Sequence, residues 1–277
     1  MKVVYKYCNA HGVDILQNLE LKITPPNQFN DPFELTPQMI CSNPTELAAR
    51  WKELNLPRIY SGLIKSGKFK GDFSDFERSF NLHHGQWLSQ RMIVAPSNVQ
   101  KRILNLQSEA NGLLCMSKRR DSILMWGHYC DKHRGLVVAF DHSYEIFQSG
   151  TSLFSVSYVP KRILWEFEWK VRLDDLKTQD ALVKTMSSKS EDWRYEQELR
   201  QVFSLSELKK KMLGKKKVGY FHPISSRAIV GVSLGVRCSK NLEKKVRSLL
   251  KRPHLSHIKL DRAVLHETDF ALEFVNC

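Results

Sequence analysis

The sequence predicts an α+β protein, with strands and helices interspersed along a single domain of residues 1–277. Three observations carry this prediction. Short runs rich in β-branched and aromatic residues recur near both ends of the chain, and a long stretch between them has apolar residues at three- and four-residue spacing. The composition, 42% hydrophobic and 26% charged, is that of an ordinary globular protein.

The first strands are expected to precede a helical insertion. Residues 3–8 combine β-branched and aromatic side chains and read as a strand, and a short helix and a second strand follow up to residue 24. Residues 25–34 must be irregular, because three prolines enforce turn geometry. From about 43 to 111 the pattern is helical and begins with an Asn cap and a Pro in the first turn. We therefore expect a helical insertion at about 43–111.

Strands and helices are also interspersed in the rest of the chain. A helix in this part is expected to be capped by Asp121. Strands are predicted at 112–117, 135–140, 153–159, 198–203, 218–223, 228–235, 258–266 and 271–275, and helices at 121–133, 173–193 and 239–252.

The charge of the chain points to an anionic partner. The formal net charge is +14, which favours nucleic acid, a phosphorylated substrate, a membrane surface or an acidic protein. The segment 206–217 concentrates six lysines around a glycine. It is either a mobile, solvated loop or a loop that binds phosphate backbones without reading bases. A nucleic-acid partner at the basic loop 206–217 is the prediction.

The compartment is predicted from what the sequence lacks. There is no long apolar run for a membrane helix, and the start has no apolar core of a signal peptide, so we expect a cytoplasmic protein without a membrane partner. The six cysteines are scattered, which argues against a disulfide framework. His128, Cys130 and His133 offer three metal ligands, but no fourth is evident, so no metal site is predicted.

Two clusters near the start combine ligand-binding residue types with ordinary structural roles. Tyr5 and Tyr7 flank Lys6 in the opening strand, so alternation places the lysine on the face opposite both rings. Asn30 and Asp31 stand in the proline-held turn. They either hydrogen-bond the backbone there or present an amide and a carboxylate to a ligand.

A third cluster lies in the helix predicted at 121–133. Trp126 and Tyr129 are three residues apart and share a helix face, with His128 between them. Such rings form core, or they stack on a flat heterocycle such as a base or nicotinamide. Walker A, dinucleotide-binding, nucleophile-elbow and zincin motifs are all absent from the sequence.

The segment SEDWRYEQELRQVF places two carboxylates where a helix gives way to a strand. If the strand begins at Glu198, then Glu196, Glu198 and Arg200 lie on one face. Like charges so close resist joint ionisation unless cations compensate, and Arg194 and Arg200 are placed to do so. The group is either a solvated set of salt bridges or a carboxylate pair aimed into a cleft.

Together these clusters resemble a bacterial family, domain of unknown function 2971. The resemblance is carried by FNDPFE, M-W-x-H-Y-x-x-x-H-x-G and W-x-x-E-x-E-x-R, and it spans nearly the whole chain. The layout also resembles the ADP-ribosyltransferase superfamily, whose members carry three spaced motifs on a split, mixed sheet. That resemblance implies a split mixed or antiparallel sheet and NAD as the substrate. This chain lacks the His or Arg common at the first motif and the Ser-Thr-Ser of the second.

The superfamily resemblance also implies residue roles. Lys6 or Tyr7 would contact the adenosine-side ribose, and Tyr129 with His128 would stack on nicotinamide. Cationic donors for the pyrophosphate would come from Lys6, Arg134 and Arg200. The predicted catalytic residues are Glu198 and its assistant Glu196, and the predicted NAD-binding residues are Tyr5, Lys6, Tyr7, Asn30, Asp31, Trp126, His128, Tyr129 and Arg200.

The implied chemistry suits two carboxylates. Breaking the nicotinamide–ribose bond develops oxocarbenium charge, which a fixed carboxylate stabilises, and a second carboxylate can deprotonate the nucleophile. The expected function is an NAD-dependent ADP-ribosyltransferase acting on RNA or DNA. By analogy it would be a bacterial toxin or phage-defence effector with an antitoxin or other regulatory protein as partner.

Two alternatives from other classes stay open. In a metal-dependent nuclease, Mg²⁺ would be held by Asp31, Glu34, Glu196 and Glu198. In a non-catalytic nucleic-acid-binding or interaction module, the same clusters would be packing features, and their substitution would change stability alone.

Overall fold

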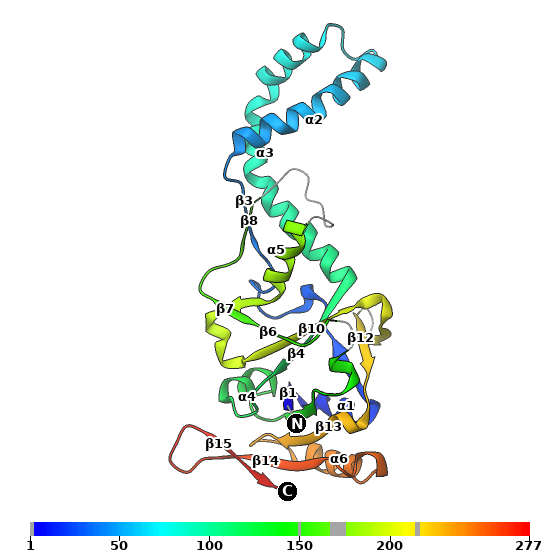
Figure 1. Cartoon of the computed structure of the whole chain (residues 1–277), viewed down its shortest axis with the longest axis vertical. Coiled ribbons are helices and arrows are strands. Elements are labelled where there is room, and N and C mark those ends of the chain that lie inside the picture. Colours follow the sequence, from blue (N-terminus) through cyan, green and yellow to red (C-terminus); the bar gives the residue numbers. More distant parts are fainter. Residues whose placement is uncertain (1–2, 149–150, 167–175, 214–216) are drawn as a thin grey trace. The chain divides into compact units, whose positions relative to one another are not determined.

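The computed structural model describes residues 3–148, 151–166, 176–213 and 217–277 (Figure 1). Strands and helices are interspersed along these residues, so the chain is α+β, as the sequence predicts. By their contacts, the described residues divide into two compact units. The first comprises Met1–Glu34, Gln107–Pro160 and Ser187–Cys277, and the second comprises Leu35–Leu106 and Lys161–Met186. The single domain expected over 1–277 stays a prediction.

A mixed sheet forms the centre of the first unit. In the described residues it has eight strands in the order β15-β14-β13-β5-β1-β4-β10-β6. Neighbouring strands are antiparallel except β13 and β14, which run parallel, so the sheet is mixed, as predicted. The strands are β1 (Val3–Cys8), β4 (Asn111–Ser117), β5 (Leu136–Asp141), β6 (Phe154–Ser155), β10 (Glu198–Ser204), β13 (Ile229–Leu234), β14 (Lys259–Leu265) and β15 (Leu272–Asn276).

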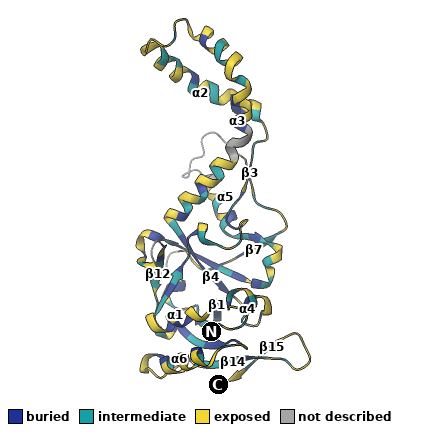
Figure 2. Cartoon of the chain, turned by 180° about the vertical axis from the view of Figure 1, so that it is seen from behind, coloured by how far each residue is buried: buried dark blue, intermediate teal, exposed yellow. Residues whose placement is uncertain are grey.

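The two faces of this sheet are covered differently. One face packs apolar side chains from β1, β4, β5 and β10 against the helices α1 (Val13–Asn18) and α6 (Lys240–Leu250). α6 is capped by Ser239 and turns Leu242, Val246 and Leu249 inward, while its other side is exposed (Figure 2). The other face carries a smaller apolar cluster beneath α4 (Ile123–Tyr129) and, beside it, polar and charged side chains.

A small antiparallel sheet of β11 (Lys209–Leu213), β12 (Lys217–Pro223) and β2 (Glu20–Ile23) belongs to the same unit. Lys209 pairs with Phe221 and Leu213 with Lys217, so β11 and β12 are the arms of a hairpin. The loop predicted at 206–217 is therefore wrong for Lys209–Leu213, because these residues make ladder hydrogen bonds to β12. Residues 214–216 lie outside the described part of the chain. Two short parallel strands, β7 (Ser157–Val159) and β9 (Ser188–Ser190), complete the unit.

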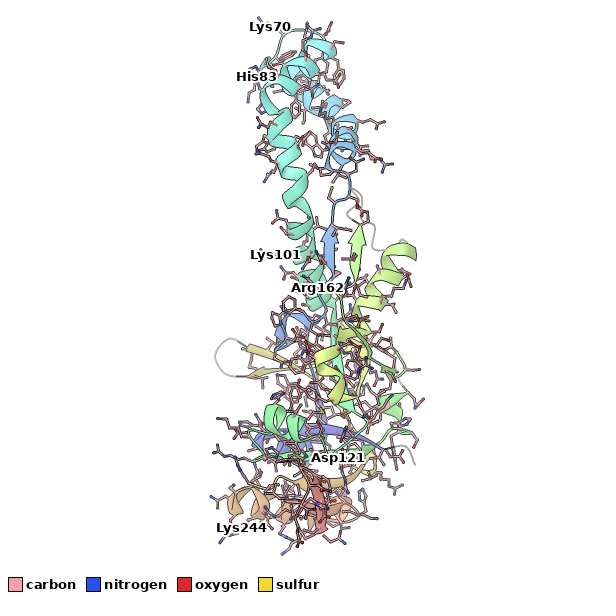
Figure 3. All side chains as sticks on the ribbon, turned by 90° about the vertical axis from the view of Figure 1, so that its left-hand side faces the viewer. Lys70, His83, Lys101, Asp121, Arg162 and Lys244 are labelled. Atoms are coloured by element: carbon pink, nitrogen blue, oxygen red, sulfur yellow. The ribbon has the colours of Figure 1, made fainter. Side chains whose placement is uncertain are left out.

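The second unit contains the predicted helical insertion. α2 (Pro44–Lys65) and α3 (Phe73–Ala110) confirm the helices expected at 43–111. Asn43 caps α2 by accepting a hydrogen bond from Glu46 N, and Lys70 lies in the turn between the two helices (Figure 3). The two helices share an apolar core with β3 (Gln38–Ile40) and β8 (Leu164–Glu166), and α5 (Leu176–Met186) packs against it.

Several element boundaries differ from the sequence-based expectation. α4 is capped by Ser122, whose hydroxyl accepts from Met125 N, and not by Asp121. The strand expected at 153–159 is divided between β6 and β7, which belong to different sheets. The helix expected at 173–193 ends at Met186, and residues 173–175 lie outside the described part of the chain. None of the described helices is both long enough and apolar enough to cross a membrane.

Candidate functional site

A pocket of about 360 Å³ opens on the charged face of the central sheet in the first unit. Its size lies in the range of small-molecule sites, roughly 300–1,000 Å³. Tyr7, Tyr129 and Glu198, one residue from each predicted motif, line it together. The other predicted site residues in its wall are Tyr5, Lys6, Asn30, His128 and Glu196.

The strand register explains why residues distant in sequence meet here. Tyr5 on β1 pairs with Ser117 on β4, and Ser117 pairs with Glu198 on β10. Paired residues of antiparallel strands share a face, so these three side chains form one row across the sheet. Within the described residues, β1 pairs with β5 from Val3 to Cys8 but with β4 at Tyr5. In this part of the chain, β1 and β4 are therefore paired only at Tyr5 and Ser117, and residues of both strands line the pocket.

The E-x-E pair converges because the backbone turns between its members. Glu196 ends a 3₁₀ helix, Gln197 adopts a left-handed conformation with φ 44°, and Glu198 begins β10. Ser117 Oγ donates to Glu196 O over 2.6 Å, and Glu198 N donates to Tyr158 Oη over 2.7 Å. The predicted convergence of the two carboxylates is confirmed, although Glu196 itself lies outside the strand.

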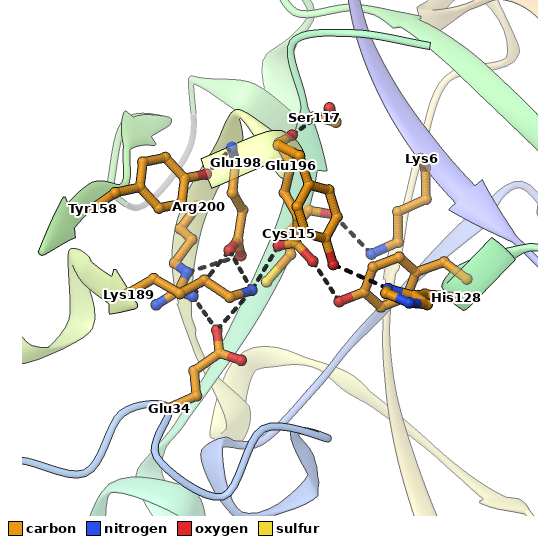
Figure 4. Close-up of polar contacts among 12 residues, drawn as sticks. Lys6, Glu34, Cys115, Ser117, His128, Tyr158, Lys189, Glu196, Glu198 and Arg200 are labelled. Carbon is orange, nitrogen blue, oxygen red and sulfur yellow. Dashed lines mark hydrogen bonds and ion pairs between the residues drawn. The ribbon is translucent and has the colours of Figure 1, made fainter. Parts of the chain in front are cut away.

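Both carboxylates belong to a buried ionic cluster (Figure 4). Lys189 Nζ lies 2.6 Å from Glu196 Oε2, 3.0 Å from Glu198 Oε2 and 3.5 Å from Glu34 Oε1. Arg200 Nε donates to Glu198 Oε1 over 2.8 Å, and its terminal nitrogen also contacts Glu34. No side chain of these five is more than 5% exposed.

The cluster holds three carboxylates and two cations, and the pKa values of Glu198 and Glu34 shift in opposite directions. Burial alone would raise the pKa of Glu198, but the charge and hydrogen bonds of Arg200, with Lys189, outweigh it and lower that pKa to about 2. For Glu34 burial dominates, and the neighbouring carboxylates add to it. The positive charges of Arg200 and Lys189 offset only part of this increase, so the pKa of Glu34 is raised to about 7. Glu198 is therefore charged at neutral pH, and Glu34 is the carboxyl that exchanges a proton there.

Aromatic side chains form the opposite side of the pocket. Tyr129 Oη donates to Glu196 Oε1 over 2.6 Å, and burial followed by the charge of Glu196 raises the pKa of Tyr129. Tyr7 Oη donates to Arg119 O over 3.1 Å, and its ring meets Trp126 edge to face at 5.7 Å. His128 is exposed and contacts Tyr195 Oη through Nδ1 at 3.0 Å. Both tyrosines are thus fixed in orientation by their hydroxyl groups.

Four residues predicted to bind NAD lie outside the pocket wall. Trp126 is fully buried in the apolar cluster and donates from Nε1 to Arg120 O. Arg200 lies behind the wall, engaged with Glu198 and Glu34. Asp31 accepts from Phe33 N through its carboxylate, which is a turn-stabilising role, and Arg134 is exposed elsewhere.

Lys189, Glu34 and Gln28 line the pocket, and sequence reasoning missed them or gave them a different role. Lys189 fell in a segment predicted to be helical, and Glu34 was considered as a metal ligand alone. An E-x-E pair on one face requires compensating cations, but nothing in the sequence marks Lys189 as one of them. Gln28 was also missed. Among the described residues, its Oε1 is one of the buried polar atoms without a hydrogen-bond partner, and Gln28 lines the pocket.

The geometry bears directly on the metal alternative. The ammonium group of Lys189 occupies the point where Glu34, Glu196 and Glu198 converge, whereas Asp31 is not part of the pocket wall and accepts from Phe33 N. A cation site of this set is therefore already filled by a side chain. His128, Cys130 and His133 have separate surroundings, since the Cys130 thiol donates to Leu136 O and His133 stacks on Trp126. Within the described ranges, no group of three or more metal-ligating residues is arranged around a common point.

Comparison with known proteins gives one match. Residues 125–201 match the family model described as a protein of unknown function (DUF2971). The matched span holds two of the three segments behind the sequence resemblance, and with them Tyr129, Lys189, Glu196 and Glu198. The match supports the resemblance to this family of unknown function, and the resemblance to ADP-ribosyltransferases stays a prediction. No curated protein matches the chain, and no solved structure does.

Proposed function

We propose that the chain transfers ADP-ribose from NAD to an acceptor, with Glu198 as the essential carboxylate. The observation that carries this proposal is the pocket in which Tyr7, Tyr129 and Glu198 converge. A carboxylate with a pKa near 2, held by Arg200 and Lys189, is both charged and fixed in position at neutral pH. Such a preorganised negative charge stabilises a cationic sugar carbon better than one that must reorient.

The nicotinamide end of NAD suits this pocket chemically. The nicotinamide ring of NAD is a cation, and the pocket wall offers it the carboxylates of Glu196 and Glu198 beside the ammonium groups of Lys6 and Lys189. The Tyr129 ring, fixed by its hydrogen bond to Glu196, offers a surface for stacking. The carboxamide N–H of nicotinamide would satisfy the buried Gln28 Oε1, whose lack of a partner otherwise costs stability.

In the proposed reaction, the bond between ribose C1′ and the nicotinamide nitrogen breaks, and nicotinamide leaves with the electron pair. Positive charge develops on C1′ next to Glu198, as in glycoside hydrolysis. A hydroxyl or amine of the acceptor bonds to C1′, and its proton passes to Glu196, two residues away from Glu198 on the same cluster. Tyr129, which already donates to Glu196, keeps that carboxylate oriented.

The acceptor we propose is nucleic acid, because the chain carries a formal net charge of +14. A toxin or phage-defence setting with a regulatory protein partner is part of the same proposal.

The test is label transfer from NAD carrying a labelled adenylate group. The purified chain is incubated with that NAD and with RNA, DNA or protein, with and without EDTA. Label on RNA or DNA, unaffected by EDTA, is the expected result, and label on protein alone would overturn the nucleic-acid acceptor. Cleavage of nucleic acid that needs no NAD and stops with EDTA would replace the proposal by the nuclease alternative.

A further inference from the structure

A second pocket of about 510 Å³ adjoins the first in the same unit. The two share Lys6, Tyr7 and Tyr129, so a ligand in one lies next to a ligand in the other. The proposed chemistry uses the first pocket for the nicotinamide end of NAD and assigns nothing to the second. Its wall includes Leu213 and Phe221, on β11 and β12 of the small sheet, together with Ile15 and Leu21.

The small sheet turns a basic face toward this second pocket. Phe221 pairs with Lys209 on β11 and with Lys22 on β2, so the three side chains share one face. Lys211, two positions after Lys209, lies on the same face with its Nζ 5.0 Å from the Phe221 ring centre. We call the surface formed by Lys22, Lys209, Lys211 and Phe221 the basic face.

Gly219 leaves the space on the basic face that the Leu213 and Phe221 side chains fill. A Cβ at Gly219 would lie 2.6 Å from Leu213 Cδ1 and 2.8 Å from the Phe221 ring. Because the glycine has none, the Leu213 and Phe221 side chains close over its backbone. Leu213 stays 38% exposed, so an apolar surface faces outward between the lysines.

Positive charge prevails around this surface. Lys209 and Lys211 both pair with Glu20, and these lysines lower the pKa of Glu20 in spite of its burial. The charged residues of the second pocket and the basic face are Lys6, Lys22, Lys209 and Lys211 on the positive side, and Asp14 and Glu20 on the negative side.

We propose that the basic face binds a single-stranded nucleic acid and leads it into the second pocket. Lysines interleaved with an aromatic ring are the arrangement that binds a strand by its phosphates and stacks its bases. Lys209 and Lys211 are two residues apart on a strand, a repeat of about 7 Å, which suits successive phosphates of an extended strand. A polyanion also uses more of these lysines than the two phosphates of NAD would.

The role of this strand as acceptor rests on the proposed function, because the shared residues would bring it to the NAD-binding pocket. The binding itself does not depend on NAD chemistry and is measured without it.

The experiment measures binding of fluorescent single-stranded oligo-U and oligo-dT to the full chain by anisotropy over a salt series. Lys211→Gln is compared with Lys210→Gln, which removes a charge from the same strand on the opposite face, beside Tyr220. Lys244→Gln on α6 removes a distant charge (Figure 3). Thermal unfolding confirms that each variant is folded.

Lys211→Gln is expected to weaken binding and reduce the slope of log K against log salt by about 1. Phe221→Leu should weaken binding about tenfold with an unchanged slope, because stacking carries no counterions. Both controls should bind like the wild type. Equal losses in Lys211→Gln and the controls would mean unspecific attraction to a basic protein and would overturn the proposal.

A second readout separates this proposal from the proposed function. If Lys211→Gln and Phe221→Leu raise the KM for NAD in acceptor-free nicotinamide release but leave oligonucleotide binding intact, the pocket holds the other half of NAD, and the proposal fails. A wild type that binds strands through the basic face but releases no nicotinamide would contradict the proposed function alone.

Discussion

The two faces of the central sheet are built from alternate residues of the same strands. On one face, Val4, Met116 and Phe140 are buried in an apolar core whose stability does not depend on ionisation. On the other, Glu198 and Arg200 are equally buried but depend on Lys189 and on the charge of their neighbours. Alternation along a strand thus places apolar packing residues on one face and the charged residues of the candidate site on the other. A shift of the strand pairing by one residue would exchange the two faces.

The largest expected effect compares Lys189 of β9, which supports the carboxylates of the charged face, with Phe140 of the apolar face. Lys189→Met leaves Glu196 and Glu198 buried without their shared cation, which should lower the free energy of unfolding by about 3–5 kcal/mol at pH 8. The loss should be smaller at pH 5, because Glu34, whose pKa of about 7 is held down in part by Lys189, is then protonated and no longer depends on that cation. Phe140→Ala on the apolar face should cost a similar amount, about 3–5 kcal/mol, at every pH. Urea denaturation at several pH values measures both, and parallel pH profiles would refute the contrast.

The next effect concerns Glu34, whose folded-state pKa is about 7 against an ordinary value of 4.5. Because this pKa is raised, the stability it contributes is present below pH 4.5 and is lost as pH rises to about 7. The loss is about 3 kcal/mol for a shift of this size, and the Glu34 side chain is 1% exposed, so solvent screening is small.

Glu34→Gln removes this titration. The variant should therefore unfold like the wild type near pH 4.5 and be the more stable of the two at pH 8. Chemical denaturation between pH 4.5 and pH 8 measures the stability of both proteins. A wild type that gains stability relative to Glu34→Gln between pH 5 and pH 7 would contradict the prediction.

The smallest effect should come from Gln28, which combines a pocket position with an unpartnered buried oxygen. Gln28→Leu removes a buried oxygen that has no hydrogen-bond partner in the free protein, so its unfolding midpoint should stay the same or rise. Its KM for NAD should rise about tenfold, since one neutral hydrogen bond to the carboxamide is lost. Steady-state nicotinamide release measures this. An unchanged KM would remove Gln28 from the proposed site.

Much of the fold could be predicted because its signals are local. β1, β4, β5 and β10 follow from short β-branched and aromatic runs, and α2 from its Asn cap and Pro44. β11 could not be predicted, because the lysines of residues 209–211 read as a solvated loop and strand formation depends on pairing with β12.

The candidate site, too, could be predicted from the sequence only in part. Alternation from Glu198 predicted that the Glu196 and Glu198 side chains converge. In the structure they do so because the backbone of Gln197 between them is in the left-handed conformation. Neither Lys189 nor Glu34 could be assigned to the cluster from sequence, because both arrive from distant segments by tertiary packing. Trp126 could not be separated from the pocket aromatics, since core and ligand-stacking rings have the same helical spacing.

The central claim is that the Glu198 carboxylate drives cleavage of the nicotinamide–ribose bond. The most direct measurement is nicotinamide release from NAD by the wild type, Glu198→Gln and the surface control Glu267→Gln, each verified as folded by thermal unfolding. We expect release by the wild type and by Glu267→Gln, and a loss of about 100-fold or more in Glu198→Gln. Release by folded Glu198→Gln at the wild-type rate, or none by the wild type, would contradict it.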